Sequence, residues 1–126
     1  MTLNDYQKKA MSTCMPSCNN FSYMMLNLVG EVGEFASKVA KLIRKEKLLM
    51  GGAENAENKL TSLALTRGEQ YEILDDLKAE AGDILWQLSG LCEIMGWKLE
   101  DVAQGNLDKL ASRKERGVID GNGDNR

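Results

Sequence analysis

The chain is 126 residues long, carries a net charge of −3, and contains no histidine and one proline. Its length supports a single domain with its own core rather than two. The absence of histidine excludes Ser-His-Asp and Cys-His catalysis, His-ligated zinc and the Glu-x-x-His pattern of di-iron bundles. The acidic balance argues against nucleic acid polymers and anionic membranes as the main binding partners.

The cysteines and the N-terminal residues indicate a cytoplasmic protein. Cys14, Cys18 and Cys92 make an odd number, and no histidine or second cysteine pair completes a zinc site. Reduced thiols of this kind are typical of the cytoplasm. The first residues lack the basic and apolar regions of a signal peptide, and no apolar run approaches the roughly 20 residues of a membrane span.

Apolar residues that recur at three- and four-residue steps predict an all-α protein. Pro16 is the only strong helix breaker, so most of the chain is free to form long helices. The predicted helices cover Leu3–Ser12, Asn19–Glu46, Glu69–Met95 and Leu99–Arg116. The apolar stripes of the last three comprise Phe21, Met24, Met25, Leu28, Val32, Phe35, Val39, Leu42 and Ile43; Ile73, Leu74, Leu77, Ala81, Ile84, Leu85, Leu88, Leu91 and Cys92; and Leu99, Val102, Ala103, Leu107 and Leu110. We expect a helical bundle of about four to five helices.

The chain shows no linker that would divide it into two domains. Residues 1–117 are expected to form a single helical domain, in which Gly96 ends the third helix. Residues 47–68 form a loop between helices or hold a short helix, since a structureless loop of that length is uncommon in a compact domain. Residues 118–126 are a polar, glycine-rich C-terminal tail.

Two segments in the middle of the long helices, residues 30–35 and 79–84, share the pattern small-Glu-x-Gly-acid-apolar. A spacing of three residues places the two acids of each segment about 60° apart on one helix face. Each pair belongs to a polar column at the edge of its helix's apolar stripe. The columns comprise Asn27, Glu31, Glu34 and Lys38 on the second helix and Asp76, Glu80, Asp83 and Gln87 on the third. A solvated acidic face is the alternative explanation.

If the two helices pack antiparallel, these columns can face each other across a cleft. Four carboxylates in one cleft would repel strongly unless a divalent cation neutralised them. Oxygen ligands without histidine or cysteine favour Mg²⁺, with Mn²⁺ as a substitute. Glycines at positions 30, 33, 82 and 90 each cost a helix about 1 kcal/mol relative to alanine. They lie near the acids, although close approach of the helices is an alternative reason for them.

A third column, on the fourth helix, is mainly basic and comprises Asn106, Lys109, Arg113 and Arg116. A basic column opposite a metal-binding acidic cleft suits a polyphosphate, because the metal bridges phosphate oxygens while Lys and Arg offset the remaining charge. The alternative is that these bases only complement the helix dipole at its C-terminus.

Taken in order, these motifs resemble the MazG-like family of all-α nucleoside triphosphate pyrophosphohydrolases, over residues 3–126. The motifs that carry the resemblance are Glu31-x-x-Glu34, Glu80-x-x-Asp83 and Asn106-Leu-Asp-Lys109-Leu-Ala-Ser-Arg113. The resemblance implies a helical bundle that assembles as a homodimer or a dimer of dimers. It also implies Mg²⁺-dependent cleavage of a (deoxy)nucleoside triphosphate between its α- and β-phosphates, giving the monophosphate and pyrophosphate.

The resemblance also implies roles for individual residues. The metal ligands would be Glu31, Glu34, Glu80 and Asp83, with Glu34 as the first choice and Glu31 as the second for acting on the attacking water. The substrate would be bound by Lys38, Asn106, Lys109, Arg113 and Arg116. Relatives often carry two adjacent acids at the start of the first motif, whereas Gly30 stands in the preceding position here, which leaves the number of metals open.

A second hypothesis belongs to a different class of protein. The chain could be a non-catalytic helical module that binds nucleotide or protein with the same bundle. Trp86 lies on the face of the third helix away from its apolar stripe. We interpret it as part of an oligomer interface, with stacking on a nucleobase as the alternative.

Overall fold

The fold is all-helical in a computed structural model that describes the backbone of residues 1–45 and 67–126, and the side chains of these residues except 67–71. Its elements are α1 (Leu3–Met11), a short 3₁₀ helix (Pro16–Cys18), α2 (Phe21–Arg44), α3 (Arg67–Ile94) and α4 (Leu99–Glu115). The all-α prediction is confirmed. The predicted loop or short helix at 47–68 lies outside the described residues except for its last two, which begin α3.

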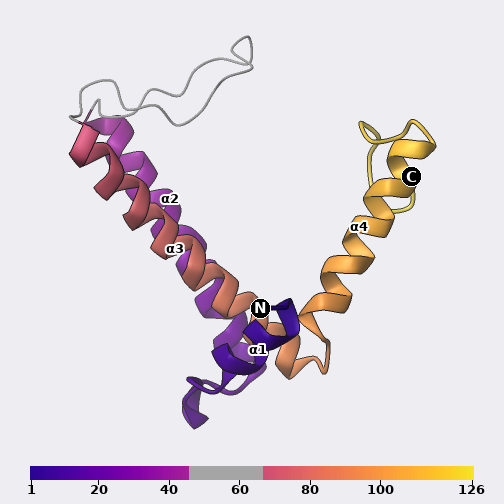
Figure 1. Ribbon diagram of the computed structural model, residues 1–126, viewed down its shortest axis with the longest axis horizontal. Coiled ribbons are helices and arrows are strands. Elements are labelled where there is room, and N and C mark those ends of the chain that lie inside the picture. The colour runs from indigo at the N-terminus through magenta and orange to yellow at the C-terminus, as the bar shows by residue number, and fades with distance from the viewer. Residues whose placement is uncertain (46–66) are drawn as a thin grey trace.

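The chain has the shape of a V (Figure 1). One arm is an antiparallel hairpin of α2 and α3, which pack along each other. α1 crosses the base of this arm and contacts both α3 and α4. α4 forms the second arm and leaves the base in a different direction. No helix in the described ranges is long and apolar enough to cross a membrane.

The α2–α3 hairpin is closely packed where Met24 meets Gly90. Met24 is fully buried, and a Cβ atom added to Gly90 would clash with the Met24 sulfur. Close approach of two helices therefore explains this glycine. It does not explain Gly33 or Gly82, where an added Cβ would meet nothing within 4 Å.

Hydrogen bonds from polar side chains, among them those of Trp86 and Gln7, attach α1 to the rest of the fold. The Trp86 indole on α3 donates hydrogen bonds to the Ala10 carbonyl, at 3.1 Å, and to the Thr13 hydroxyl, at 3.0 Å. The buried Gln7 amide donates to the Trp97 carbonyl at 2.9 Å and accepts from the Leu99 amide at 2.7 Å. Trp86 is half-buried and has hydrogen-bond partners within its own chain, and its interpretation as an oligomer contact or a base-stacking residue stays a prediction. The face of α3 turned away from α2 is occupied by α1 of the same chain.

The two ends of the α3–α4 connection are built in different ways, one from backbone hydrogen bonds around a glycine and the other from side chains of α1. Gly96 has a φ of +72°, and the Trp97 amide behind it donates to the Cys92 carbonyl at 2.8 Å. This pattern is a Schellman motif, which ends α3 as predicted. α4 then starts without a side-chain cap from Lys98. Gln7 and Asn4 of α1 satisfy the first amides of α4 instead.

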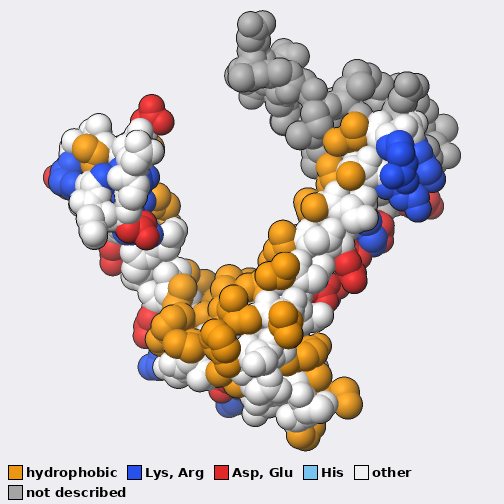
Figure 2. Space-filling view, turned by 180° about the vertical axis from the view of Figure 1, so that it is seen from behind, with side chains coloured by type: hydrophobic (Ala, Val, Ile, Leu, Met, Phe, Trp, Pro, Cys, Tyr) orange, Lys and Arg blue, Asp and Glu red, His pale blue; other side chains and the backbone are white. Residues whose placement is uncertain are grey.

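The apolar core of one chain is smaller than the predicted stripes imply. Among the described side chains the buried apolar ones are Ala10, Met24, Leu77, Cys92 and Leu99. Many predicted core residues are exposed, because a two-helix arm covers only one side of each helix and α4 diverges. They include Phe21, Met25, Val32, Ile43, Leu74, Leu85, Leu88, Val102, Leu107 and Leu110. Figure 2 shows hydrophobic side chains along the inner side of the α2–α3 arm and over the base of the V. Within the described residues, the four helices of one chain leave these apolar faces open.

Candidate metal centre

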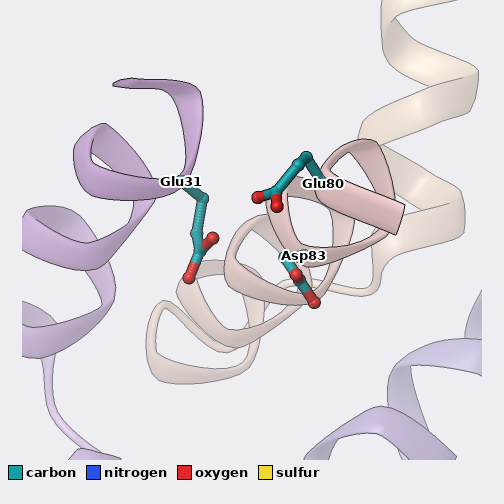
Figure 3. Close-up of side chains that lie close together, drawn as sticks. All are labelled: Glu31, Glu80 and Asp83. Carbon is teal, nitrogen blue, oxygen red and sulfur yellow. The ribbon is translucent and has the colours of Figure 1, made fainter. Parts of the chain in front are cut away.

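Three carboxylates from the two helices of the hairpin converge in the middle of that arm. Glu31 projects from α2 toward Glu80 and Asp83 on α3 (Figure 3). One ligand oxygen from each lies within 4.8 Å of the others. The two acidic motifs meet because α2 and α3 are antiparallel, so that the columns predicted at the edges of their apolar stripes run side by side.

Burial and charge both act on Glu31. Its carboxylate accepts a hydrogen bond of 3.1 Å from the Asn27 amide, one helical turn earlier. Burial first, and then the neighbouring charges of Glu34 and Asp83, raise the pKa of Glu31 above its ordinary value. A carboxyl group whose negative form is disfavoured in this way gains most from a nearby cation.

Lys38 supplies a cation at one side of the cluster. Its ammonium group lies 2.9 Å from an Asp76 oxygen and also pairs with Glu80. Hydrogen bonds to Asp76 and then to Glu80 raise the pKa of Lys38 above its ordinary value. Lys38 was predicted to bind substrate, and in this structure its partners are these two carboxylates of α3.

Glu80 is the most enclosed of the three acids. One of its oxygens pairs with Lys38, while the other, Oε2, is buried and has no hydrogen-bond partner among the described residues. A buried carboxylate oxygen without a partner costs free energy, which a bound cation would recover. Three converging carboxylates with one free, buried oxygen fit a hard cation such as Mg²⁺.

Glu34 is placed differently from the other predicted ligands. It is exposed on α2 and does not belong to the group of three whose oxygens converge. Its position three residues after Glu31 rotates its side chain around the helix by about 60°. Its charge still reaches Glu31, since it contributes to the raised pKa of that carboxyl. A role as ligand or as base stays a prediction.

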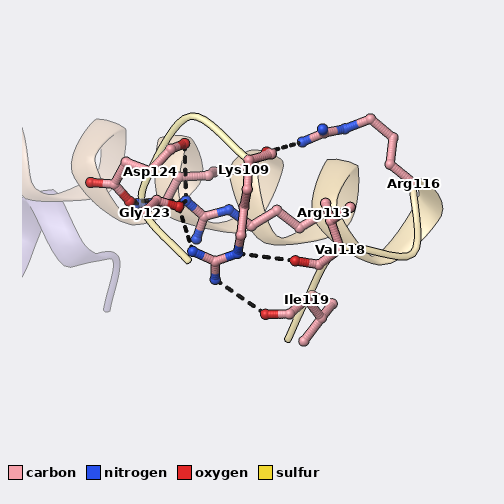
Figure 4. Close-up of polar contacts among 8 residues, drawn as sticks. Lys109, Arg113, Arg116, Val118, Ile119, Gly123 and Asp124 are labelled. Carbon is pink, nitrogen blue, oxygen red and sulfur yellow. Dashed lines mark hydrogen bonds and ion pairs between the residues drawn. The ribbon is translucent and has the colours of Figure 1, made fainter. Parts of the chain in front are cut away.

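The basic column of α4 lies on the other arm of the V, away from the acids of the same chain (Figures 1 and 2). Lys109, Arg113 and Arg116 contact the C-terminal tail there (Figure 4), and Asn106 is exposed on the same helix. The expectation that the basic column lies opposite the acidic cleft is therefore wrong within one chain. The cause is the turn at Gly96, which directs α4 away from the hairpin.

Several neighbours of the acids were not predicted as site residues. Gln87 is 3% exposed, and its Oε1 atom has no hydrogen-bond partner in the described part of the chain. Burial, followed by the charge of Asp83, raises the pKa of the Tyr6 phenol, which places α1 beside the cluster. Asn27 and Gln87 belong to the two predicted columns, so helix periodicity could have identified them as neighbours of the acids. No sequence pattern could have identified Tyr6, because its position depends on how α1 packs against α3.

The family model of the MazG nucleotide pyrophosphohydrolase domain matches residues 19–118. A protein of Mycobacterium phage L5, the Gene 37 protein, is 41% identical over 110 residues, which cover 87% of this chain and 80% of the phage protein. The name of that relative states no activity. No solved structure matches the chain.

Proposed function

Because the chain belongs to the MazG nucleotide pyrophosphohydrolase family, we propose that it is a Mg²⁺-dependent enzyme that cleaves nucleoside triphosphates. The bond hydrolysed is the one between the α- and β-phosphates of a ribo- or deoxyribonucleotide, and the products are the monophosphate and pyrophosphate. The observation that carries the proposal is the convergence of Glu31, Glu80 and Asp83, together with the buried oxygen of Glu80 that lacks a partner.

The chain's own carboxylates divide the work of the site. Glu31, Glu80 and Asp83 hold the metal, and Glu34 at the exposed edge is the first choice to orient or deprotonate the attacking water, with Glu31 as the second. If its side chain rotates toward the other three carboxylates, Glu34 serves as a fourth metal ligand. A bound Mg²⁺, or Mn²⁺ in its place, would lower the pKa of coordinated water and offset charge on the phosphates.

The phosphates of the substrate also need cations from the protein. Lys109, Arg113 and Arg116, with Asn106 beside them, are the candidates, and they lie on the α4 arm. We expect a second copy of the chain to bring its α4 to the acids, as a homodimer or within a dimer of dimers. Exposed leucines at 107 and 110, with 60% and 41% of their surface accessible, support such a contact. Lys38 would join them when the metal replaces it at Glu80.

The remaining features of the chain agree with an enzyme acting on small nucleotides in the cytoplasm. Its net charge of −3 does not favour nucleic acid polymers or membranes, and its odd number of cysteines suits a reducing compartment. The alternative function is a helical module that binds nucleotide or protein without turnover. It would keep the stabilisation by Mg²⁺ and nucleotide but release no product.

The decisive experiment measures Mg²⁺-dependent pyrophosphate release from a panel of ribo- and deoxyribonucleoside triphosphates. We expect release from at least one substrate. Asp83→Asn and Glu80→Gln should each lower kcat by about a hundredfold or more, because each removes a metal ligand. Asp75→Asn is the matched control, because Asp75 is an exposed acid on the same helix outside the cluster. Unchanged activity in Asp83→Asn, or no release from any nucleotide, would contradict the proposal.

A further inference from the structure

The C-terminal tail, residues 118–126, folds back along the end of α4 after a turn at Gly117 (Figure 4). Gly117 and Gly123 have φ values of +68° and +76°, which permit its two reversals. The Val118 amide caps α4 by donating to the Arg113 carbonyl at 2.9 Å. Arg126 closes the loop by donating to the Val118 carbonyl at 3.0 Å. The tail is therefore a built turn structure rather than a loose end.

Oxygen atoms of this tail contact the three bases of the predicted column, Lys109, Arg113 and Arg116. One Asp124 carboxylate oxygen lies 2.9 Å from Arg113 Nη2 and 3.3 Å from Lys109 Nζ. The Asp124 carbonyl accepts from the same Arg113 nitrogen at 3.1 Å. Arg116 donates to the Arg126 carbonyl at 2.8 Å. One carboxylate oxygen shared by a lysine and an arginine is the arrangement that a phosphate oxygen would take.

The tail buries the Arg113 side chain but accepts hydrogen bonds from only one of its nitrogen atoms, Nη2. Arg113 is 4% exposed, and its hydrogen-bond partners all belong to the tail. Its Nε atom is buried and has no partner in the described part of the chain. A phosphate can accept from Nε and Nη2 together, so it would satisfy a donor that the tail leaves unused.

We propose that the tail is an autoinhibitory strap in which Asp124 holds the place of a substrate phosphate on Lys109 and Arg113. This inference rests on the proposed function, because it assigns these bases to the triphosphate. The strap has to leave before a nucleotide reaches Arg113. Asp124 is 81% exposed in its side chain, so water and salt screen its attraction to the bases. A triphosphate carries more charge and displaces it, which makes the strap a competitor rather than a permanent block.

The test measures binding of inorganic tripolyphosphate by calorimetry without Mg²⁺, so that the metal centre does not contribute. Asp124→Asn is expected to bind roughly three- to tenfold more tightly than the unaltered chain, the range for loss of a screened ion pair shared by two bases. Asp120→Asn removes the same charge from the same tail without touching the bases, and should bind like the unaltered chain. Deleting 119–126, which keeps the Val118 cap, should bind at least as tightly as Asp124→Asn.

A double variant shows whether the effect acts through the proposed base. When Arg113→Gln is present, adding Asp124→Asn should bring a smaller gain in affinity, because only Lys109 is then released. Equal affinity of Asp124→Asn and Asp120→Asn, weaker binding after the deletion, or a gain that is undiminished without Arg113 would each overturn the strap. The result is independent of turnover. Tighter tripolyphosphate binding by Asp124→Asn without pyrophosphate release from any nucleotide would support the strap and refute the hydrolase. Normal pyrophosphate release with the same KM in Asp124→Asn as in the unaltered chain would support the hydrolase and refute the strap.

Discussion

Glu31 is the residue on which the surroundings of the cluster act most clearly. Burial and the charges of Glu34 and Asp83 raise the pKa of Glu31, while the Asn27 amide opposes them by stabilising the ionised form. Lys38 offsets part of the negative charge through Glu80. The two carboxyl groups therefore differ: Glu80 has a protein cation beside it, whereas Glu31 is the one whose ionised form a bound metal would stabilise most.

The raised pKa of Glu31 predicts how metal binding changes with pH. A cation binds the ionised carboxyl, and below its pKa the proton must be displaced. Because this pKa lies above its ordinary value of 4.5, affinity for Mn²⁺ should fall as pH is lowered, and the fall should begin at higher pH than for an ordinary glutamate. Below the raised pKa we expect about a tenfold loss per pH unit. Titrations followed by electron paramagnetic resonance between pH 7.5 and 4.5 measure this.

Glu31→Gln provides the comparison for that titration. It should bind Mn²⁺ more weakly at neutral pH. Its affinity should also no longer fall in the pH range above the ordinary pKa of a glutamate, because the group with the raised pKa is gone. An affinity that stays constant in the unaltered protein until the ordinary glutamate range is reached would show that Glu31 is not a ligand.

At the scale of elements, the α2–α3 hairpin determines the distance between the two acidic motifs. Its glycines divide into two kinds. Gly90 allows the backbone of α3 to approach Met24, whereas Gly82, beside the acids, faces open space within one chain. A substitution by alanine therefore has opposite expected effects at the two positions.

Gly82→Ala should stabilise the isolated chain by up to about 1 kcal/mol, because alanine is the better helix former. Gly90→Ala should destabilise it by about 1 kcal/mol or more, since the buried Met24 side chain must move to admit the new methyl group. Urea unfolding of the two variants measures the difference. A smaller cost of Gly90→Ala in a Met24→Ala background than in the unaltered chain is the internal check. Equal effects at both glycines would mean that the hairpin is not packed as described.

At the scale of the whole molecule, the V shape separates the candidate catalytic groups. The acids belong to one arm and the candidate phosphate-binding bases to the other, and apolar side chains of both arms are exposed. Association with a second copy of the chain would bury these faces. In the dimer that we propose, the bases of one chain would reach the acids of the other.

This arrangement predicts complementation between two inactive variants. Asp83→Asn keeps the bases, and Lys109→Ala/Arg113→Ala keeps the acids, so a mixed dimer contains one intact site. When equal amounts are refolded together, about a quarter of the normal sites should be restored, as for random pairing in a two-fold dimer. Pyrophosphate release from the mixture measures it, and a mixture of Asp83→Asn with Glu80→Gln is the control that should stay inactive. No recovery in the first mixture would exclude sites shared between chains.

Much of the local structure was predictable from the sequence. All four α-helices lie within two residues of their predicted ends. The columns containing Glu31, Glu80 and Asp83 were also predictable, because the 3.6-residue period alone decides which residues share a helix face. The docking of α1 through Gln7 and Trp86 was not, since it depends on hydrogen bonds between residues far apart in the chain.

The sequence by itself therefore determined an all-α protein without histidine, its helices, and the family to which it belongs. Helix formation and motif spacing are local, and local rules suffice for them. Only the tertiary structure decided that three acids rather than four converge, that α4 diverges from the hairpin, and that the tail holds Lys109 and Arg113. The direction of a helix depends on a turn and on a few distant contacts. A small change in either moves a whole column of side chains, so periodicity alone does not establish which columns meet.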